Sequence, residues 1–419
     1  MSLQGPIIVV ADTPSGDLVE ALGAAGAFPV IESTWADAPT AFVSVKPCAI
    51  VIADPGPPPS EANARMLCLQ IATAAGPMVP VIARTLADRD LPVPIALAVD
   101  SELPAEHVIA RLRAALRVRA LHSTVLRRIE SFGSEHGKLP ELPVGDPLQD
   151  ATVMIVGRGP LYPALIAAIG ERFGLLGALS VDTAARHLNS RAIDGIVIGD
   201  SFGQLMIEAF LTLLTQDERF RHIPVSVIGE VPADLAERLP NVDCSDADPK
   251  RLVARMTPQV RLHAFEARLK RMLASLDSDG IIDPETGLLT RHHFWQELKK
   301  AIHDSGQQGH ALSIGRFSFD GDLPDRATKD GARLLARLNR ASDFACLDDD
   351  GTLLLAFGQT DLRSAHLVAR RIAAALKNGM VPRRPGPVDA HVILATLKGT
   401  DTLDSLLQRV HGGEVVAAE

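Results

Sequence analysis

The sequence predicts a multidomain α/β protein in which two doubly wound parallel sheets are followed by an α+β domain. The chain has 419 residues, more than one ordinary hydrophobic core organises. Short apolar runs typical of buried strands alternate with helical periodicity, as in parallel-sheet proteins, until the last third of the chain. There, two strand-like runs are joined by Asp-Asp-Asp-Gly at 348–351, and Asp-Gly suits the tight turn of a hairpin.

The first predicted domain covers residues 1–130, and a linker follows over 131–150. Between 131 and 149, Gly, Pro and Ser interrupt all periodicity, which indicates a domain boundary. The strand-like runs of this domain and its closing helix are predicted at 6–12, 48–53, 79–83 and about 105–130.

The second predicted domain covers residues 151–274 and repeats the same plan, so the chain carries a weak internal repeat. A second linker is predicted at 275–282. The strand-like runs and the closing helix of this domain are predicted at 152–156, 195–198, 224–228 and about 249–274.

The third predicted domain covers residues 283–412, and a tail follows at 413–419. It begins with a helix after residue 290, and its central feature is the antiparallel hairpin around 348–351. The other strands and helices are predicted at 311–317 (strand), 325–338 (helix), 343–347 and 352–357 (paired strands) and 362–376 (helix).

Composition excludes two classes of function. The formal net charge is −9 and both signs are mixed along the chain, so direct DNA binding is not expected. No basic stretch precedes an apolar run near Met1, and no apolar segment is long enough for a membrane span. We therefore expect a cytoplasmic protein.

The four cysteines lack metal-ligand spacing and are interpreted as buried thiols: Cys48, Cys68, Cys244 and Cys346.

The first domain resembles the receiver domains of response regulators. Asp54 stands at the end of the third strand of the receiver plan, and Asp12 at the end of the first strand. Thr85 follows the fourth strand. The resemblance implies that Asp54 accepts a phosphoryl group from a histidine kinase, that Asp12 and Asp54 hold Mg²⁺, and that Thr85 is a switch residue. Ala11 replaces a second acidic residue, and no Lys follows the fifth strand. The alternative is that Asp54 only caps a strand and begins a turn.

The second domain lacks the acidic residues of a receiver site. Its first strand ends in Val156-Gly-Arg158, so a cation there would meet a guanidinium group. Asp200 is interpreted as a turn residue, because it has no metal partner. We expect an adaptor or dimerisation module.

The third domain resembles GGDEF domains, which condense two GTP molecules into cyclic di-GMP. Its opening, Asp283-Pro-Glu-Thr-Gly-Leu-Leu-Thr-Arg-His-His-Phe294, is similar to the family's Asp-x-Leu-Thr-Gly-Leu-x-Asn-Arg-x-x-Phe. The family's glycine-rich catalytic signature is replaced by Asp349-Asp-Gly-Thr-Leu353, and Arg316 and Ser318 stand where the family supplies metal-binding Asp. The resemblance therefore implies a domain without cyclase activity.

The inhibitory-site motif Arg-x-x-Asp of the family is present as Arg340-Ala-Ser-Asp343. Arg donates two parallel hydrogen bonds to O6 and N7 of guanine, and a carboxylate accepts from N1 and N2. Arg371 matches a secondary arginine of the family, and Arg370 adjoins it. Cyclic di-GMP is the expected ligand. The alternative is a surface ion pair of little energetic value beside a solvated helix face.

The order of the three domains resembles the PleD-type response regulators and, in its pattern of losses, their PopA-like branch. That resemblance implies a cyclic di-GMP effector and adaptor, located at a cell pole, that presents proteins to the ClpXP protease in the cell cycle and forms a homodimer. Two other hypotheses remain: a divergent but active diguanylate cyclase, and a structural hub that binds no nucleotide.

Overall fold

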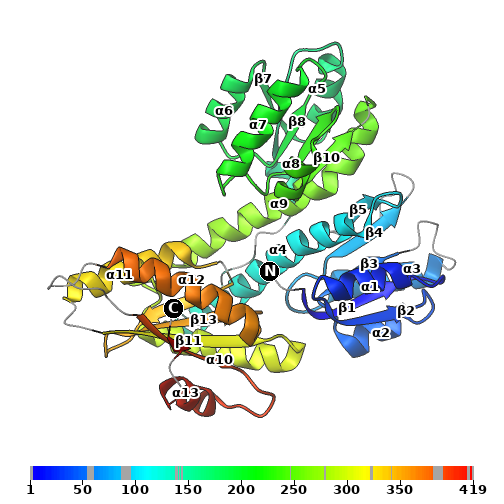
Figure 1. Ribbon diagram of the computed structural model, residues 1–419. Helices are drawn as coiled ribbons and strands as arrows, with labels where there is room; N and C mark the ends of the chain where they lie inside the picture. Colours follow the sequence, from blue (N-terminus) through cyan, green and yellow to red (C-terminus); the bar gives the residue numbers. More distant parts are fainter. Residues whose placement is uncertain are drawn as a thin grey trace.

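The computed structural model places three α/β units along the chain (Figure 1). The first unit ends with the long helix α4, and the second ends with the long helix α9. The third unit follows α9 and forms an antiparallel sheet. The described residues are 3–53, 61–85, 96–136, 140, 142, 145–245, 247–277, 280–320, 324–340, 342–380, 390–412 and 416–417.

The first unit is a parallel sheet in the order β2-β1-β3-β4-β5, which is a doubly wound arrangement. Ile7 and Val9 point to the face that α1 and α4 cover, whereas Ile8 and Val10 point to the face of α2 and α3. Because both faces are covered, the central strands are continuous apolar runs. The elements are β1 (Gln4–Val10), α1 (Gly16–Ala24), β2 (Phe28–Ser33), α2 (Ala38–Val45), β3 (Ala49–Ile52), α3 (Glu61–Thr73), β4 (Val81–Thr85), β5 (Ala96–Asp100) and α4 (Ala105–His136).

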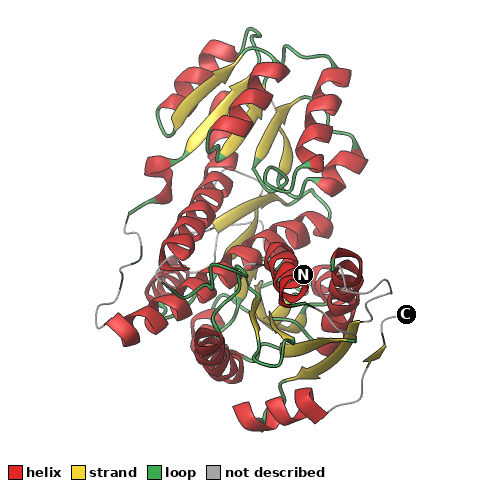
Figure 2. Cartoon of the chain, turned by 90° about the vertical axis from the view of Figure 1, so that its left-hand side faces the viewer, coloured by secondary structure: helices red, strands yellow, loops and turns green. Residues whose placement is uncertain are grey.

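The second unit repeats this order as β7-β6-β8-β9-β10. α5 and α9 cover one face and α6 and α7 the other, and Figure 2 shows helices on both sides of these strands at the top of the view. The elements are η1 (Pro147–Asp150), β6 (Thr152–Val156), α5 (Tyr162–Gly170), β7 (Gly174–Ala178), α6 (Val181–Ser190), β8 (Gly195–Ile198), α7 (Gln204–Gln216), β9 (Val225–Ile228), α8 (Ala233–Arg238), β10 (Val242–Ser245) and α9 (Pro249–Asp277).

The third unit is an antiparallel sheet in the order β12-β13-β11-β14-β15. Its βαββαβ succession is the split-βαβ plan of ferredoxin-like folds. α11 and α12 pack on one face and α10 and α13 on the other. The elements are α10 (Arg291–Gln308), β11 (Leu312–Phe319), α11 (Asp325–Leu338), β12 (Phe344–Leu347), β13 (Leu353–Gly358), α12 (Leu362–Gly379), β14 (Ala390–Thr396), α13 (Leu403–Gly412) and β15 (Val416–Ala417).

The mixed α/β architecture predicted from the sequence is confirmed, with two parallel sheets and one antiparallel sheet. The predicted strands 152–156 and 195–198 and the predicted helix 325–338 have the same bounds in the structure. A doubly wound sheet occurs in several protein classes, so the sheets alone do not identify receiver domains.

Several element ends differ from the prediction. α4 continues to His136 instead of ending near residue 130, because Ser131 Oγ donates to the carbonyl oxygen of Arg127 and accepts from Lys300 Nζ of α10 at 2.9 Å. α9 continues to Asp277, where Leu276 is buried. Part of the predicted tail is strand β15, which pairs with β14.

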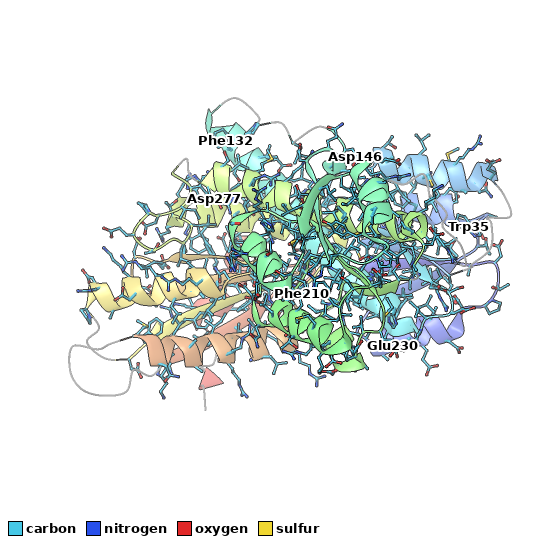
Figure 3. All side chains as sticks on the ribbon, turned by 90° about the horizontal axis from the view of Figure 1, so that it is seen from above. Trp35, Phe132, Asp146, Phe210, Glu230 and Asp277 are labelled. Atoms are coloured by element: carbon cyan, nitrogen blue, oxygen red, sulfur yellow. The ribbon has the colours of Figure 1, made fainter. Side chains whose placement is uncertain are left out.

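The helices α4 and α9 join the three units. Val118, Leu121 and Val125 of α4 share a core with Leu269 and Leu276 of α9. Figure 3 labels Phe132 and Asp277, near the ends of these two helices, in the same part of the molecule. The helices therefore form a common stem against which each unit packs.

Polar contacts reinforce this stem. Arg111 of α4 forms an ion pair with Asp243 of the second unit. Arg117 of α4 forms one with Glu266 of α9. Burial alone raises the pKa of Glu266, but the charges of Arg117 and Lys270 outweigh burial and lower its pKa to about 2. The stem is thus held by buried charge pairs as well as by apolar contacts.

The cysteines correct one expectation. Cys48 and Cys346 are buried and Cys68 is half-buried, but Cys244 is exposed on the edge strand β10. Along β10 only Val242 is buried, and the strand becomes more exposed toward Cys244. All four thiols are free.

None of the helices in the described part of the chain combines the length and apolar character that a membrane span needs.

Candidate functional site

The predicted pair Arg340 and Asp343 lies in the turn between α11 and β12, at one end of the third sheet. The backbone N–H of Asp343 donates to the carbonyl oxygen of Arg340 at 3.0 Å and closes the turn. Arg340 is exposed and Asp343 is half-buried. Both side chains therefore leave one compact element, hereafter the 340–343 turn, within which Ala341 is outside the described residues.

Asp343 is the anchored member of the pair. Its Oδ1 accepts from the backbone N–H of Gly358 and from Ser342 Oγ, both at 3.2 Å. Burial raises the pKa of Asp343 to about 6, although the charge of Arg340 opposes the rise. A backbone hydrogen bond from Arg340 also favours the charged form of this carboxylate. The turn and the end of β13 thus hold the carboxylate of Asp343 in place.

Gly358, the last residue of β13, is required for this arrangement. A Cβ at this position would collide with the carbonyl oxygen of Ser342. The absence of a side chain lets the end of β13 approach the turn and donate its N–H to Asp343. Sequence reasoning missed Gly358, because a strand-end glycine alone gives no signal of its partner.

Arg370 and Arg371 lie on α12, which packs beside α11. Both are exposed, and no hydrogen bond or ion pair among the described residues joins either of them to Arg340 or Asp343. The structure therefore places the four predicted ligand residues in one helical layer and its adjoining turn, but it brings only Arg340 and Asp343 together.

This layer carries a set of arginines with a common property. Each is exposed, and none forms an ion pair with any residue that the structure describes. We call them the arginine layer: Arg326, Arg337, Arg340, Arg363, Arg370 and Arg371.

The hairpin between β12 and β13 occupies the other end of strand β12. The N–H of Gly351 donates to the carbonyl oxygen of Asp348 at 3.0 Å, and Gly351 has a φ of +79°. This left-handed backbone suits glycine at that position. The predicted hairpin is confirmed, and it lies one strand length away from the 340–343 turn.

The acidic residues of the hairpin pair with arginines of the same unit. Arg316 of β11 donates to Asp350 at 2.7 Å, and Arg291 of α10 donates to Asp348 at 2.6 Å. Burial alone raises the pKa of Asp350, but hydrogen bonds from Thr352 and Arg316 outweigh it and lower the pKa to about 2. Sequence reasoning treated Arg316 and Asp350 as separate losses. Arg316 stands at a predicted metal position and Asp350 at a glycine position of the signature, and their opposite charges were the signal that they pair.

Behind the 340–343 turn lies a cavity of about 30 Å³ that is shared with α4. Its lining includes Ser123 and Thr124 of α4 and Ser342 and Gly358 of the third unit. This is room for a water molecule with polar partners. His310 also lines it, and burial lowers the pKa of His310 to about 4. The sequence did not predict that the closing helix of the first unit contacts this turn.

The predicted receiver residues of the first unit are only partly described. Asp54 lies outside the described residues. Asp12 is exposed, and its Oδ1 accepts from the backbone N–H of Trp35 at 3.0 Å. Thr85 is the last residue of β4 and pairs with Asp100 of β5. Across the described ranges, no group of three or more His, Cys, Asp or Glu side chains is arranged to hold a metal ion.

Arg158 and Asp200 lie in neighbouring loops of the second unit. Arg158 is exposed, and its backbone N–H donates to Ser201 Oγ at 2.9 Å. The carboxylate of Asp200 lies so close to Gly159 that a Cβ there would collide with it. Asp200 thus folds over the loop after β6, as expected for a turn residue.

Comparison with known proteins gives similarity to GGDEF domains over about a third of the chain. The coiled coil and GGDEF domain of DgcB from Caulobacter crescentus, in complex with c-di-GMP, is 19% identical over 35% of this chain and 84% of that one, with a TM-score of 0.30. Diguanylate cyclase SiaD with its activator SiaC from Pseudomonas aeruginosa is 21% identical over 35% and 61%, with a TM-score of 0.30.

The FimX GGDEF domain from Pseudomonas aeruginosa is 16% identical over 31% of this chain and 89% of that one, with a TM-score of 0.28. No protein-family model and no curated protein matches the sequence. Identities and TM-scores at this level assign neither a ligand nor an activity to this chain.

Proposed function

We propose that the chain is a catalytically inactive cyclic di-GMP effector that binds its ligand at the 340–343 turn and recruits partner proteins. The observation that carries the proposal is the placement, in one turn, of an exposed Arg340 and an Asp343 that the backbone of Gly358 anchors. Arg340 forms no ion pair within the described residues, so its guanidinium group keeps its donors for a ligand.

Guanine fits this pair chemically. The guanidinium group of Arg340 has two parallel N–H donors for O6 and N7 of the base. The carboxylate of Asp343 accepts hydrogen bonds from N1–H and N2–H of guanine. A base without these two donors would leave the carboxylate unsatisfied. Recognition of guanine therefore uses both residues, and loss of either one leaves the other without a partner.

The phosphates of a cyclic dinucleotide need separate cationic groups. Arg371 and Arg370 supply two guanidinium groups on α12, and both are free of internal ion pairs within the described residues. Arginine binds phosphate through a planar fork of donors. Side-chain rotation or a shift of α12 would have to bring Arg371 to the ligand, because no hydrogen bond or ion pair among the described residues joins it to the turn.

The hairpin supports the absence of cyclase activity. A cyclase needs Mg²⁺ and phosphate oxygens next to a glycine-rich backbone. Here the guanidinium of Arg316 lies 2.7 Å from Asp350, so a cation already neutralises that carboxylate. Asp349, 80% exposed and paired with Arg291 at 3.0 Å, places a bulky ion pair where a glycine backbone would approach a triphosphate. Both features disfavour GTP and metal binding.

The finer parts of the proposal rest on the sequence resemblance. In the first unit, a histidine kinase would phosphorylate Asp54, with Mg²⁺ held by Asp12 and Asp54, and Thr85 would act as the switch residue. The chain would be located at a cell pole and would deliver proteins to the ClpXP protease. The contact between the 340–343 turn and α4 supports one further step. A ligand at the turn would favour one packing of the first unit against the third.

Two measurements on the full chain test this function. Incubation with GTP and Mg²⁺ should yield no cyclic di-GMP by chromatography, and formation of product would support the divergent cyclase instead. Thermal unfolding should shift upward with cyclic di-GMP and remain unchanged with GTP, because a ligand that binds only the folded state stabilises it. An unchanged midpoint with cyclic di-GMP would support the structural hub.

A further inference from the structure

The chain carries two segments of opposite charge that its overall net charge hides. α12, residues 362–379, contains Arg363, Arg370, Arg371 and Lys377 and no Asp or Glu. Residues 1–45 contain five acidic residues and no Lys, Arg or His: Asp12, Asp17, Glu20, Glu32 and Asp37. The two segments are therefore complementary in charge over their whole lengths.

The cationic groups of α12 form one face with an apolar centre. Arg363, Leu367, Arg370 and Arg371 follow the spacing i, i+4, i+7 and i+8, which places them on the same side of a helix. The side chain of Leu367 is 69% exposed among these arginines. We call this the α12 face. An exposed leucine surrounded by unpaired cations is typical of a docking surface with an acidic rim on the partner.

Arg363 adds a reason to seek an external partner. It lies in the first turn of α12, where the helix dipole disfavours a cation. Asp361 caps this turn and accepts from the backbone N–H of Ser364, but no carboxylate within the described ranges forms an ion pair with Arg363. The described part of the chain therefore supplies no charge partner for Arg363, whereas an approaching anionic surface would.

The acidic segment is also available. Asp17 and Glu20 are three residues apart on α1, and both are exposed, as is Asp37 before α2. None of these three forms an ion pair among the residues that the structure describes. Their charges are thus directed to solvent in the isolated chain.

Within one molecule the two segments cannot meet. Figures 1 and 3 show α12 and the first unit, where Trp35 is labelled, on opposite sides of the molecule. We propose that a second copy of the chain supplies the partner, so that the acidic segment of one copy docks on the α12 face of the next. Such a contact is heterologous and joins copies head to tail. It does not require the ligand proposed above.

A charge-exchange experiment tests this association. Sedimentation velocity of the full chain would follow the wild type, Arg363→Glu, Glu20→Lys and an equimolar mixture of the two variants. Arg172→Glu, an exposed arginine of the second unit, is the matched control. Circular dichroism would confirm that each variant folds.

At low ionic strength, the sedimentation coefficient of the wild type should increase with protein concentration. The increase should be smaller at about 0.3 M salt, because salt screens exposed charges. Each single variant should associate about tenfold more weakly, and the mixture should recover wild-type association, since each variant keeps the face that the other has lost. The control should behave as the wild type.

Three results would overturn the proposal. One is a wild-type chain that stays monomeric at every concentration in low salt. Another is association to which both charge reversals make no difference, which would indicate a different interface. The third is a mixture no better than its components.

Discussion

Arginines have different surroundings in α4 and in the arginine layer of the third unit. In α4, Arg111, Arg117, Arg127 and Arg128 each form an ion pair, and Arg119 donates to backbone carbonyl groups. Most of these side chains are buried. In the arginine layer every member is exposed, and none has an ion pair within the described residues.

The difference shows how to separate structural from functional charge in a chain with many arginines. A buried guanidinium must be paired, because an unpaired charge in the interior is costly. An exposed guanidinium group needs no partner for folding, so exposed arginines without an ion pair are candidates for contact with an external anion. The presence of an arginine in the sequence does not by itself indicate whether its charge is structural or functional.

The largest expected effect follows from breaking a pair of α4. Arg127 Nε donates to Glu297 Oε1 at 2.8 Å, and the Glu297 side chain is 2% exposed. Arg127→Ala should lower the free energy of unfolding by about 3 kcal/mol, because it leaves a buried carboxylate without its partner. Urea denaturation would measure the loss. Arg113 is an exposed arginine of the same helix, so Arg113→Ala should leave the urea midpoint unchanged. Equal losses of stability in the Arg127 and Arg113 variants would contradict the distinction between paired and unpaired arginines.

The second prediction concerns the arginine layer. Arg340→Ala should weaken cyclic di-GMP binding by about 10- to 100-fold, the range for losing one bidentate contact to guanine. Its thermal midpoint without ligand should match the wild type. Calorimetric titration would compare it with Arg326→Ala, at the far end of α11. Equal losses in both variants would indicate a general charge effect instead of a site.

The third prediction is a pH dependence. Burial raises the pKa of Asp343 to about 6, so the carboxyl is protonated in the folded chain below that pH. Only the carboxylate accepts from both N–H groups of guanine. Affinity should be full above pH 7 and fall below pH 6, by up to about tenfold per pH unit. Asp343→Asn should bind more weakly with no such fall, and a wild-type affinity that is constant between pH 7 and 5 would contradict the assignment.

The smallest expected effect is at the hairpin. The ion pair between Arg316 and Asp350 is partly exposed, so Asp350→Asn should destabilise the chain by less than about 1 kcal/mol at pH 7. The pKa of Asp350 is lowered to about 2, so the contribution of this pair is present above the ordinary Asp pKa. It is lost as the pH falls toward 2. Chemical denaturation at pH 7 and pH 3 would check both statements.

Much of the fold could be predicted from periodicity, because parallel strands buried on both faces are continuous apolar runs. β6 and β8 are such strands, and their bounds were predicted correctly. The edge strands β7 and β10 were missed. β7 reads Gly-Leu-Leu-Gly-Ala and β10 reads Val-Asp-Cys-Ser, and only neighbouring strands define them.

The candidate site was predictable only in its residue types. Motif spacing identified Arg340 and Asp343, and the structure places them in one turn. The role of Gly358 and the contact with α4 depend on residues brought together from distant parts of the chain, which no local pattern encodes. Whether Arg371 approaches the ligand stays a prediction.

Hydrogen–deuterium exchange of the full chain, with and without saturating cyclic di-GMP, would locate the bound ligand. Binding at the 340–343 turn should slow exchange at the amides of Asp343 and Gly358 and along α12 around Arg371, and leave exchange at Asp348 to Thr352 of the hairpin unchanged. Unchanged exchange at the 340–343 turn, or protection confined to the hairpin, would contradict it.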